Sequence, residues 1–134
     1  MHRWFLIAAA LIGALSVALG AFAAHGLKQV MPAEAVAIFE TGVRYQFYHA
    51  FALMAVAILY EKFPGSLLRW AGNCFQIGIV LFSGSLYLLT ALKATETMGS
   101  RNIGLITPFG GLFFIVGWML MLIAFIKKDP VSGN

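Results

Sequence analysis

The stretch WFLIAAALIGALSVALGAFAA, residues 4–24, decides the fold because it carries no charged side chain along its whole length. A helix needs about 20 apolar residues to cross the hydrocarbon core of a membrane. The stretch therefore predicts a membrane-spanning helix. The alternative is a secretory signal peptide, in which Ala21-Phe22-Ala23 would be the cleavage site. Its apolar part exceeds the ~7–15 residues typical of signal peptides, which favours a retained helix.

The composition of the 134-residue chain extends this prediction to the whole sequence. Hydrophobic residues make up 61% and charged residues only 10%, and a soluble domain of this size cannot hide so much apolar surface. The net charge of +4 comes from scattered basic residues rather than a basic run, so we expect no nucleic-acid partner. Cys74, the only cysteine, is interpreted as a small buried hydrophobe.

Charged residues divide the chain into four apolar segments. Three charge-free gaps of 24, 23 and 25 residues are each long enough for one crossing, while the gap from Arg44 to Glu61 holds only 16 residues. The second helix must therefore include Arg44 or end early. The predicted spans are residues 4–24, 42–60, 70–92 and 108–126. The fold class is an all-α integral membrane four-helix bundle that forms a single transmembrane domain.

Two proline-containing segments indicate how the second and fourth spans begin. Pro32 suits a first helical position, and the apolar stripe after Ala33 predicts a short interfacial helical segment that leads into the second span. At the fourth span, Thr107 fits an N-cap and Pro108 the first helical position. The alternative is a helix that starts at Ile103 and is kinked at Pro108.

Four spans place both termini on one side of the membrane. That side carries Arg3, Lys62, Arg69, Lys127 and Lys128, and the other side carries Lys28, Lys93, Arg101 and, at the boundary, Arg44. An excess of Lys and Arg marks the cytoplasmic face. We therefore expect a multi-pass protein with cytoplasmic N- and C-termini. Tyr60 and Trp70 flank the second loop and fit an aromatic belt on that face.

Small residues predict how the helices pack, because apolar helices in lipid associate through close approach and interhelical hydrogen bonds. The expected packing positions are Gly13, Gly20, Gly84, Gly110, Gly111 and Gly117. A tight bundle is the main interpretation of these positions. A groove for lipid or quinone, or a seam between subunits, is the alternative.

Polar side chains inside the spans are costly and therefore candidates for function. The candidate polar cluster is His25, Glu40, Arg44, Tyr45, Gln46, His49, Ser83, Ser85 and Thr107. Helical spacing pairs Glu40 with Arg44 at i,i+4, and His25, followed by a glycine, is expected to end the first helix. The main interpretation is a hydrogen-bonded network that fixes helix register. The alternative is a relay for protons or ions.

No catalytic motif is recognisable in the sequence: HExxH, a P-loop, GxGxxG in a βαβ setting and GxSxG do not occur. We therefore expect neither an enzymatic activity nor a cofactor. A metal or haem held by His25 and His49 is a weaker alternative, because two isolated histidines carry no ligand spacing.

Four segments resemble the motifs of one family. GAFAAHGL at 20–27 resembles its G-A-F-(G/A)-A-H-G-L signature, and FETGVRYQFYHA at 39–50 contains its T-(G/A)-x-x-Y-Q-x-Y-H-A motif. FSGSLY at 82–87 and ITPFGG at 106–111, followed by Gly117-Trp118, resemble its remaining elements. The chain is thus similar to the domain of unknown function 423 family of YgdD-type inner-membrane proteins, whose eukaryotic relatives include mitochondrial transmembrane protein 256. This resemblance implies a four-helix protein of the inner (plasma) membrane without an assigned activity.

Two functions from different classes fit these observations. The first is a structural or accessory membrane protein associated with membrane lipids, either as a homo-oligomer or within a larger membrane complex. The second is a small transporter or proton-conducting module, which predicts a hydrated cavity that reaches Gln46 and His49. Because three of the motif segments fall near one bilayer face, we also expect a polar pocket that opens to the outer side.

Overall fold

The computed structural model describes residues 1–95 and 100–127, and every regular element within these ranges is helical. The predicted positions of Lys128, of the tail from Asp129 and of the Arg101 side chain lie outside what is described. The elements are α1 (Arg3–Phe22), the π-helical segment η1 (Ala23–Leu27), α2 (Lys28–Val30), α3 (Ala33–Leu59), α4 (Ser66–Gly78), the π-helical segment η2 (Ile79–Ser83), α5 (Gly84–Ala94), α6 (Ser100–Gly104) and α7 (Ile106–Lys127). The all-α part of the predicted fold class is confirmed for these ranges.

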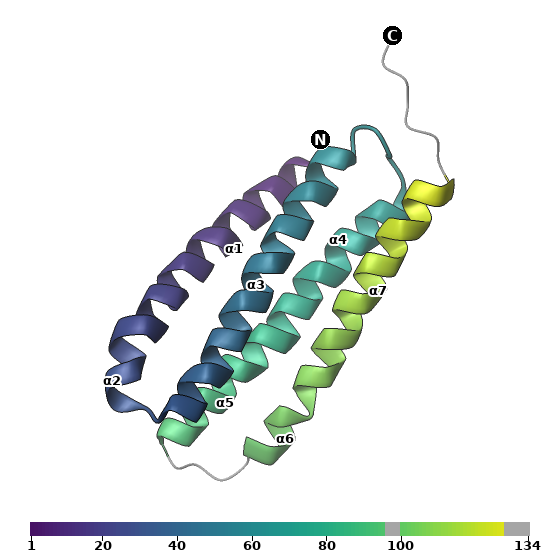
Figure 1. Cartoon of the computed structure of the whole chain (residues 1–134). Helices are drawn as coiled ribbons and strands as arrows, with labels where there is room; N and C mark the ends of the chain where they lie inside the picture. Colours follow the sequence, from purple (N-terminus) through teal and green to yellow (C-terminus); the bar gives the residue numbers. More distant parts are fainter. Residues whose placement is uncertain (96–99, 128–134) are drawn as a thin grey trace.

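The described residues form four long helical segments that run side by side (Figure 1). α1 with η1 and α2 makes the first segment, α3 the second, α4 through α5 the third, and α7 the fourth. α1 packs along α3, α4 packs along α7, and η2 contacts both α3 and α7. Successive segments run in opposite directions, so the N-terminus and the end of α7 lie at the same end of the bundle (Figure 1).

Three of the four segments are long and apolar enough to cross a membrane. They are Arg3–Val30, Ser66–Ala94 and Asn102–Lys127. The central part of α3 is less apolar because it carries Arg44, Gln46 and His49. A crossing by α3, and with it the four-span bundle, therefore stays a prediction.

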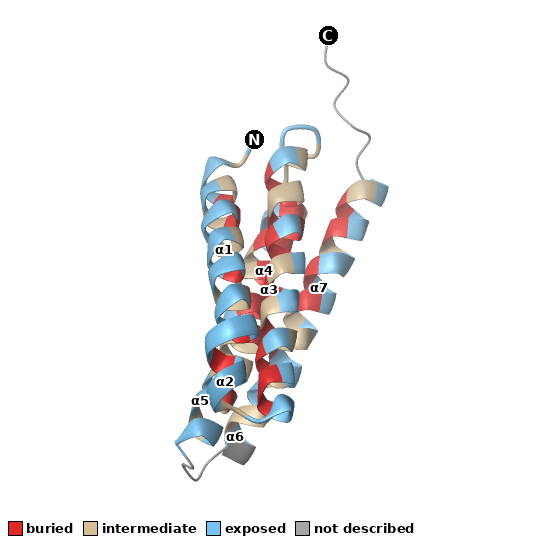
Figure 2. Cartoon of the chain, turned by 60° about the vertical axis from the view of Figure 1, so that its left-hand side comes forward, coloured by how far each residue is buried: buried red, intermediate tan, exposed pale blue. Residues whose placement is uncertain are grey.

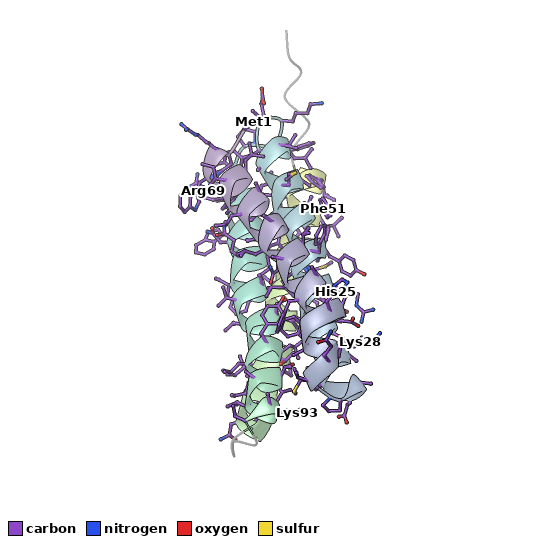
Figure 3. The ribbon with its side chains drawn as sticks, turned by 90° about the vertical axis from the view of Figure 1, so that its left-hand side faces the viewer. Met1, His25, Lys28, Phe51, Arg69 and Lys93 are labelled. Carbon is purple, nitrogen blue, oxygen red and sulfur yellow. The ribbon has the colours of Figure 1, made fainter. Side chains whose placement is uncertain are left out.

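The outward faces of the helices are apolar. Leu11, Phe51 and Ile115 are each about 60% exposed, on three different segments. Figure 2 shows the buried residues gathered on the inward faces of the helices, and Figure 3 shows Phe51 on the outer surface between the two ends of the bundle. So much outward-facing apolar surface is suited to contact with lipid.

A hydrophobic core joins all four long segments at the end that holds the termini. Phe5 of α1 packs directly over Gly72 of α4, and a Cβ at Gly72 would collide with its ring. Gly117 of α7 lies against Phe75 of α4 in the same way, with an added Cβ only 2.7 Å from the ring. Small residues thus allow α1 and α7 to approach α4 closely.

The predicted end of the first helix at His25 is wrong. η1 contains both His25 and Gly26, and helical backbone continues to Val30. The segment ends there because Met31 precedes Pro32 and adopts an extended backbone, with φ −121° and ψ 148°, as residues before proline commonly do. Pro32 itself is extended and immediately precedes α3, one position before the helical position predicted for it.

The predicted start of the last helix is also wrong. α7 begins at Ile106, so Thr107 and Pro108 lie inside its first turn and not at the N-cap and first helical position. Proline is tolerated there because the first amide groups of a helix have no intrahelical acceptor. A single turn residue, Leu105, separates α7 from α6.

Candidate functional site

The buried polar side chains lie where the long helices meet. Among the side chains of residues 1–95 and 102–127, no buried nitrogen or oxygen lacks a hydrogen-bond partner. Four interhelical contacts account for most of this network, and they tie α3 to α1, to η2 and α5, and to α7. In an apolar surrounding an unpartnered polar atom is costly, so a complete network constrains how the helices can pack.

Gln46 links three helices and is only 5% exposed. Its amide Nε2 donates to the backbone oxygen of Ile12 in α1 at 3.3 Å. Its Oε1 accepts from the phenol of Tyr87 in α5 at 2.7 Å. The α1–α3–α5 contact is therefore held by one side chain that uses both ends of its amide.

Ser83 and Ser85 connect the third segment to both of its neighbours. Ser83 is fully buried and donates to the backbone oxygen of Gly42 in α3 at 2.6 Å. Ser85 donates to the Phe82 carbonyl at 2.8 Å, and its oxygen lies 2.7 Å from the hydroxyl oxygen of Thr107. Because the Ser85 proton is directed to a carbonyl, Thr107 is the donor between the two hydroxyls.

His49 connects α3 to α7 and is 5% exposed. Its Nδ1 lies 2.7 Å from the Tyr45 carbonyl oxygen, and the indole Nε1 of Trp118 donates to its Nε2 at 3.2 Å. A carbonyl only accepts and an indole N–H only donates, so this arrangement requires a neutral imidazole with its proton on Nδ1. The ring also stacks on Phe114 at a centroid distance of 3.5 Å.

A groove opens beside His49, between α3 and α7. Its volume is about 560 Å³, within the range of ~300–1,000 Å³ typical of small-molecule sites. Its lining is Tyr45, His49, Phe82, Pro108, Gly111, Leu112, Phe114, Ile115 and Trp118. Both nitrogens of His49 are already engaged in hydrogen bonds, so the groove offers mainly apolar and aromatic surface.

The exposed members of the candidate cluster lie outside the buried network. His25 bonds through Nδ1 to the Ala21 carbonyl of its own helix at 3.0 Å. Arg44 donates to Thr41 at 3.5 Å, and it makes no ion pair with Glu40 in the described part of the chain, so that predicted pair is not formed. These exposed side chains face the surroundings of the bundle instead of its interior.

The arrangement of the histidines does not fit a shared metal or haem. His25 is exposed on η1, whereas His49 is buried and uses both ring nitrogens. Among the residues that the structure describes, no group of three or more His, Cys, Asp or Glu side chains is placed to hold a metal ion.

The predicted packing glycines differ in their surroundings. Gly110 lies against the backbone of Phe82, and an added Cβ would collide with it. At Gly20 and Gly111 an added Cβ would make ordinary contacts of 3.5 Å and 3.9 Å, whereas at Gly13 and Gly84 it would meet no atom within 4 Å. An added Cβ would also come within 3 Å of a neighbouring aromatic ring at Gly42 and Gly72, which were not among the predicted positions.

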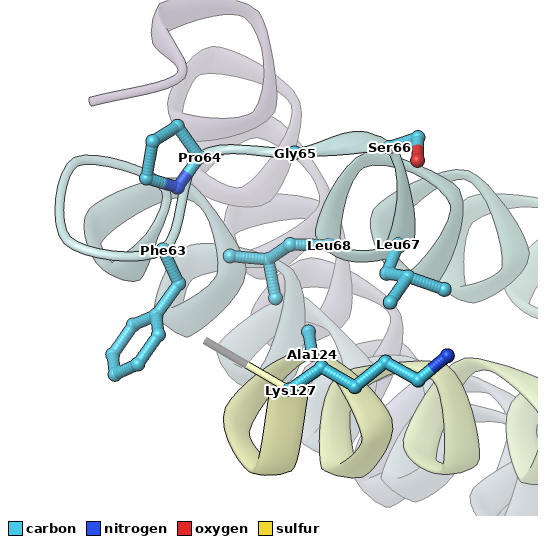
Figure 4. A pocket seen from close by; sticks show the side chains of 8 residues that line it. All are labelled: Phe63, Pro64, Gly65, Ser66, Leu67, Leu68, Ala124 and Lys127. Carbon is cyan, nitrogen blue, oxygen red and sulfur yellow. The ribbon is translucent and has the colours of Figure 1, made fainter. Parts of the chain in front are cut away.

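A second, smaller cavity lies at the turn between α3 and α4 (Figure 4). Its volume is about 200 Å³, and it is lined by residues 63–68 together with Ala124 and Lys127 of α7. Apolar side chains form most of its wall, and Lys127 is the charged residue on its lining (Figure 4). Since no other titratable group borders it, we assign no chemistry to this cavity.

Two network residues, Tyr87 and Trp118, were not in the predicted cluster. Tyr87 donates a hydrogen bond to the amide oxygen of Gln46, and Trp118 donates one to Nε2 of His49. The available signal was their chemistry, because a buried phenol or indole usually finds a hydrogen-bond partner. A search of the apolar spans for Tyr and Trp would have added both.

The helical fold, the apolar outer surface and the paired polar interior define the class as a small helical membrane protein. The family model described as "Protein of unknown function (DUF423)" matches residues 19–111, and the chain belongs to this family, a family of membrane proteins.

Curated relatives cover almost the whole chain. The UPF0382 membrane protein YwdK of Bacillus subtilis is 41% identical over 92% of this chain and 96% of its own length. A UPF0382 membrane protein of Haemophilus influenzae is 40% identical over 98% of this chain and 100% of its own length. The UPF0382 inner membrane protein YgdD of Escherichia coli is 38% identical over 97% and 96%, respectively. No solved structure gives a significant match.

Proposed function

We propose that the chain is a four-span accessory protein of the inner membrane that holds one lipid acyl chain in the groove between α3 and α7. The groove beside His49 carries this proposal. It is large enough for a ligand, apolar in its lining, and open on the outer surface of the bundle. An acyl chain suits it because the lining offers apolar contacts and its one imidazole has no free nitrogen.

The polar network supports a structural role over a conducting one. A proton relay needs groups that can exchange hydrogen-bond partners along a hydrated path. In the described residues, Gln46, Ser83 and His49 are each engaged by a partner on another helix. These contacts favour a fixed bundle that keeps the groove open.

Four spans with cytoplasmic termini fit the arrangement of the bundle. Both ends of the described chain lie at one end of the molecule (Figure 1), as an even number of crossings requires. The related YgdD of Escherichia coli is named an inner membrane protein. The excess of Lys and Arg at the end with the termini favours the cytoplasm for that end.

Photolabelling tests the groove. The protein is reconstituted in vesicles that contain a phospholipid with a diazirine on one acyl chain, and the labelled peptides are identified. We expect labelling concentrated on the groove face of α7. Gly111→Leu fills the groove, and an added Cβ there has room, so this variant should fold and lose most of that labelling.

Gly84→Leu is the matched control, because it makes the same change at a glycine with no atom within 4 Å of an added Cβ. It should keep the labelling of α7. Labelling spread evenly over all outward helix faces, or unchanged in Gly111→Leu, would refute the acyl-chain groove.

Cysteine accessibility tests the orientation. In a Cys74→Ser background, a membrane-impermeant maleimide added to intact spheroplasts should label Lys28→Cys and Lys93→Cys. Lys62→Cys should react only after the membrane is opened. The reverse pattern would place the termini outside.

A further inference from the structure

The boundary of the bilayer can be placed on the bundle by counting from its aromatic end. Trp4 and Tyr60 lie at the end that holds the termini, where Tyr60 also accepts from Arg69 at 3.1 Å. Aromatic residues of this kind mark the membrane–water interface. The hydrocarbon core takes up about 20 helical residues, so the opposite boundary falls near Ala24 on the first segment and near Glu40 on α3.

A cavity lies at this opposite boundary. It has a volume of about 470 Å³ and lies between the end of the first helical segment and the start of α3. Its lining is Ala24, Lys28, Met31, Ala33, Val36, Ala37 and Glu40. Figure 3 shows Lys28 in the same half of the molecule as Lys93, away from Met1 and Arg69.

Lys28 and Glu40 bring opposite charges to this one cavity. Both side chains are exposed, and they make no ion pair with each other. The nearby ion pair joins Lys93 to Glu34 at 3.4 Å and does not line the cavity. Among the described residues, neither Lys28 nor Glu40 has an ion-pair partner. Both line a space with apolar walls at the level of lipid headgroups.

We propose that this cavity binds the headgroup of a zwitterionic phospholipid that carries a primary amine, as phosphatidylethanolamine does. Lys28 pairs with the phosphate diester, and Glu40 accepts hydrogen bonds from the ammonium group. Ala24, which lies at the boundary itself, then borders the apolar part of the lipid below its headgroup.

The charges favour this headgroup over the other common ones. Phosphatidylcholine presents a trimethylated ammonium that has no N–H to donate to a carboxylate. Phosphatidylglycerol has no ammonium, and its negative charge would be repelled by Glu40. The site should therefore rank phosphatidylethanolamine first.

This inference rests on the bilayer placement proposed above, but it does not require the acyl-chain groove, which lies on the other face of α3. The two sites can therefore be tested separately in one preparation. Gly111→Leu, which blocks the groove, should leave headgroup preference unchanged.

Native mass spectrometry tests the headgroup site. Purified full-length protein is titrated in detergent with phosphatidylethanolamine, phosphatidylcholine and phosphatidylglycerol of matched acyl chains. Glu40→Gln should weaken phosphatidylethanolamine binding about fivefold, which corresponds to the loss of one solvent-exposed ion pair. The same variant should improve phosphatidylglycerol binding. Lys28→Gln should weaken all three lipids to a similar degree, because all three carry the phosphate.

Glu34→Gln is the matched control, since it removes the same charge from α3 but breaks only the ion pair with Lys93. It should leave the lipid ranking unchanged. Equal binding of phosphatidylethanolamine and phosphatidylcholine by the unaltered protein would overturn the inference, as would an equal loss in Glu34→Gln and Glu40→Gln. If the unaltered protein shows no labelling concentrated at the groove but keeps its headgroup ranking, only the proposed function is contradicted.

Discussion

The indole of Trp118 donates to Nε2 of His49 across the boundary between α3 and α7, at 3.2 Å. Together with the Tyr45 carbonyl on Nδ1, this contact holds the imidazole in one neutral tautomer. These contacts favour a structural role for the His49 ring at the edge of the groove over the relay role that its sequence position also allowed.

Replacing Trp118 with Phe should destabilise the bundle, because it leaves Nε2 of a buried imidazole without a donor. We expect a loss of about 1–2 kcal/mol in the free energy of unfolding, measured by steric trapping in bicelles. Trp70→Phe is the matched control at a position that is 59% exposed, and it should cost less than about 0.5 kcal/mol. Equal losses at the two positions would mean that the indole bond contributes nothing.

Gln46 and Tyr87 should behave as a coupled pair, because their contact at 2.7 Å satisfies both side chains. Gln46→Leu and Tyr87→Phe should each destabilise the protein by about 1 kcal/mol, since each removes this interhelical hydrogen bond. The double variant should cost less than the sum of the two. Strict additivity in this double-mutant cycle would contradict the contact.

Gly110 and Gly84 should respond oppositely to alanine. A Cβ at Gly110 would collide with the Phe82 backbone, whereas at Gly84 it would meet no atom within 4 Å. We expect Gly110→Ala to destabilise by about 1–3 kcal/mol through overpacking. Gly84→Ala should be neutral or stabilising by up to about 1 kcal/mol, because alanine favours helix. Thermal unfolding of both variants in the same detergent gives the comparison.

The same two glycines show where sequence reasoning stops. The apolar spacing of the chain predicted the long helices because periodicity and length depend on each residue's own neighbours in sequence. Gly110 and Gly84 both lie in apolar helices and look alike in sequence, and only the packing of α7 onto η2 separates them. Which small residue carries a contact depends on helix rotation, which local sequence does not specify.

In the candidate site, too, the sequence predicted which residues are involved but not how they are placed. Ser83, Ser85 and Thr107 were predicted as polar residues that need partners, and they have them. Their positions depend partly on η2, where the wider π-helical turn shifts the helical register of the residues that follow. No residue type predicts such a turn. Glu40 and Arg44 had helical spacing suited to an ion pair, but the Arg44 side chain bonds to Thr41 instead.

The most direct test of the central claim, a closed polar network beside a lipid-filled groove, is solid-state NMR of ¹⁵N-histidine-labelled protein in lipid bilayers. The spectra report the His49 tautomer and the magnetisation that reaches its ring from water or from acyl chains. We expect a neutral ring protonated on Nδ1, with transfer from acyl-chain protons and almost none from water. A strong water signal at His49, or a ring that exchanges between tautomers, would contradict the account and favour a hydrated path.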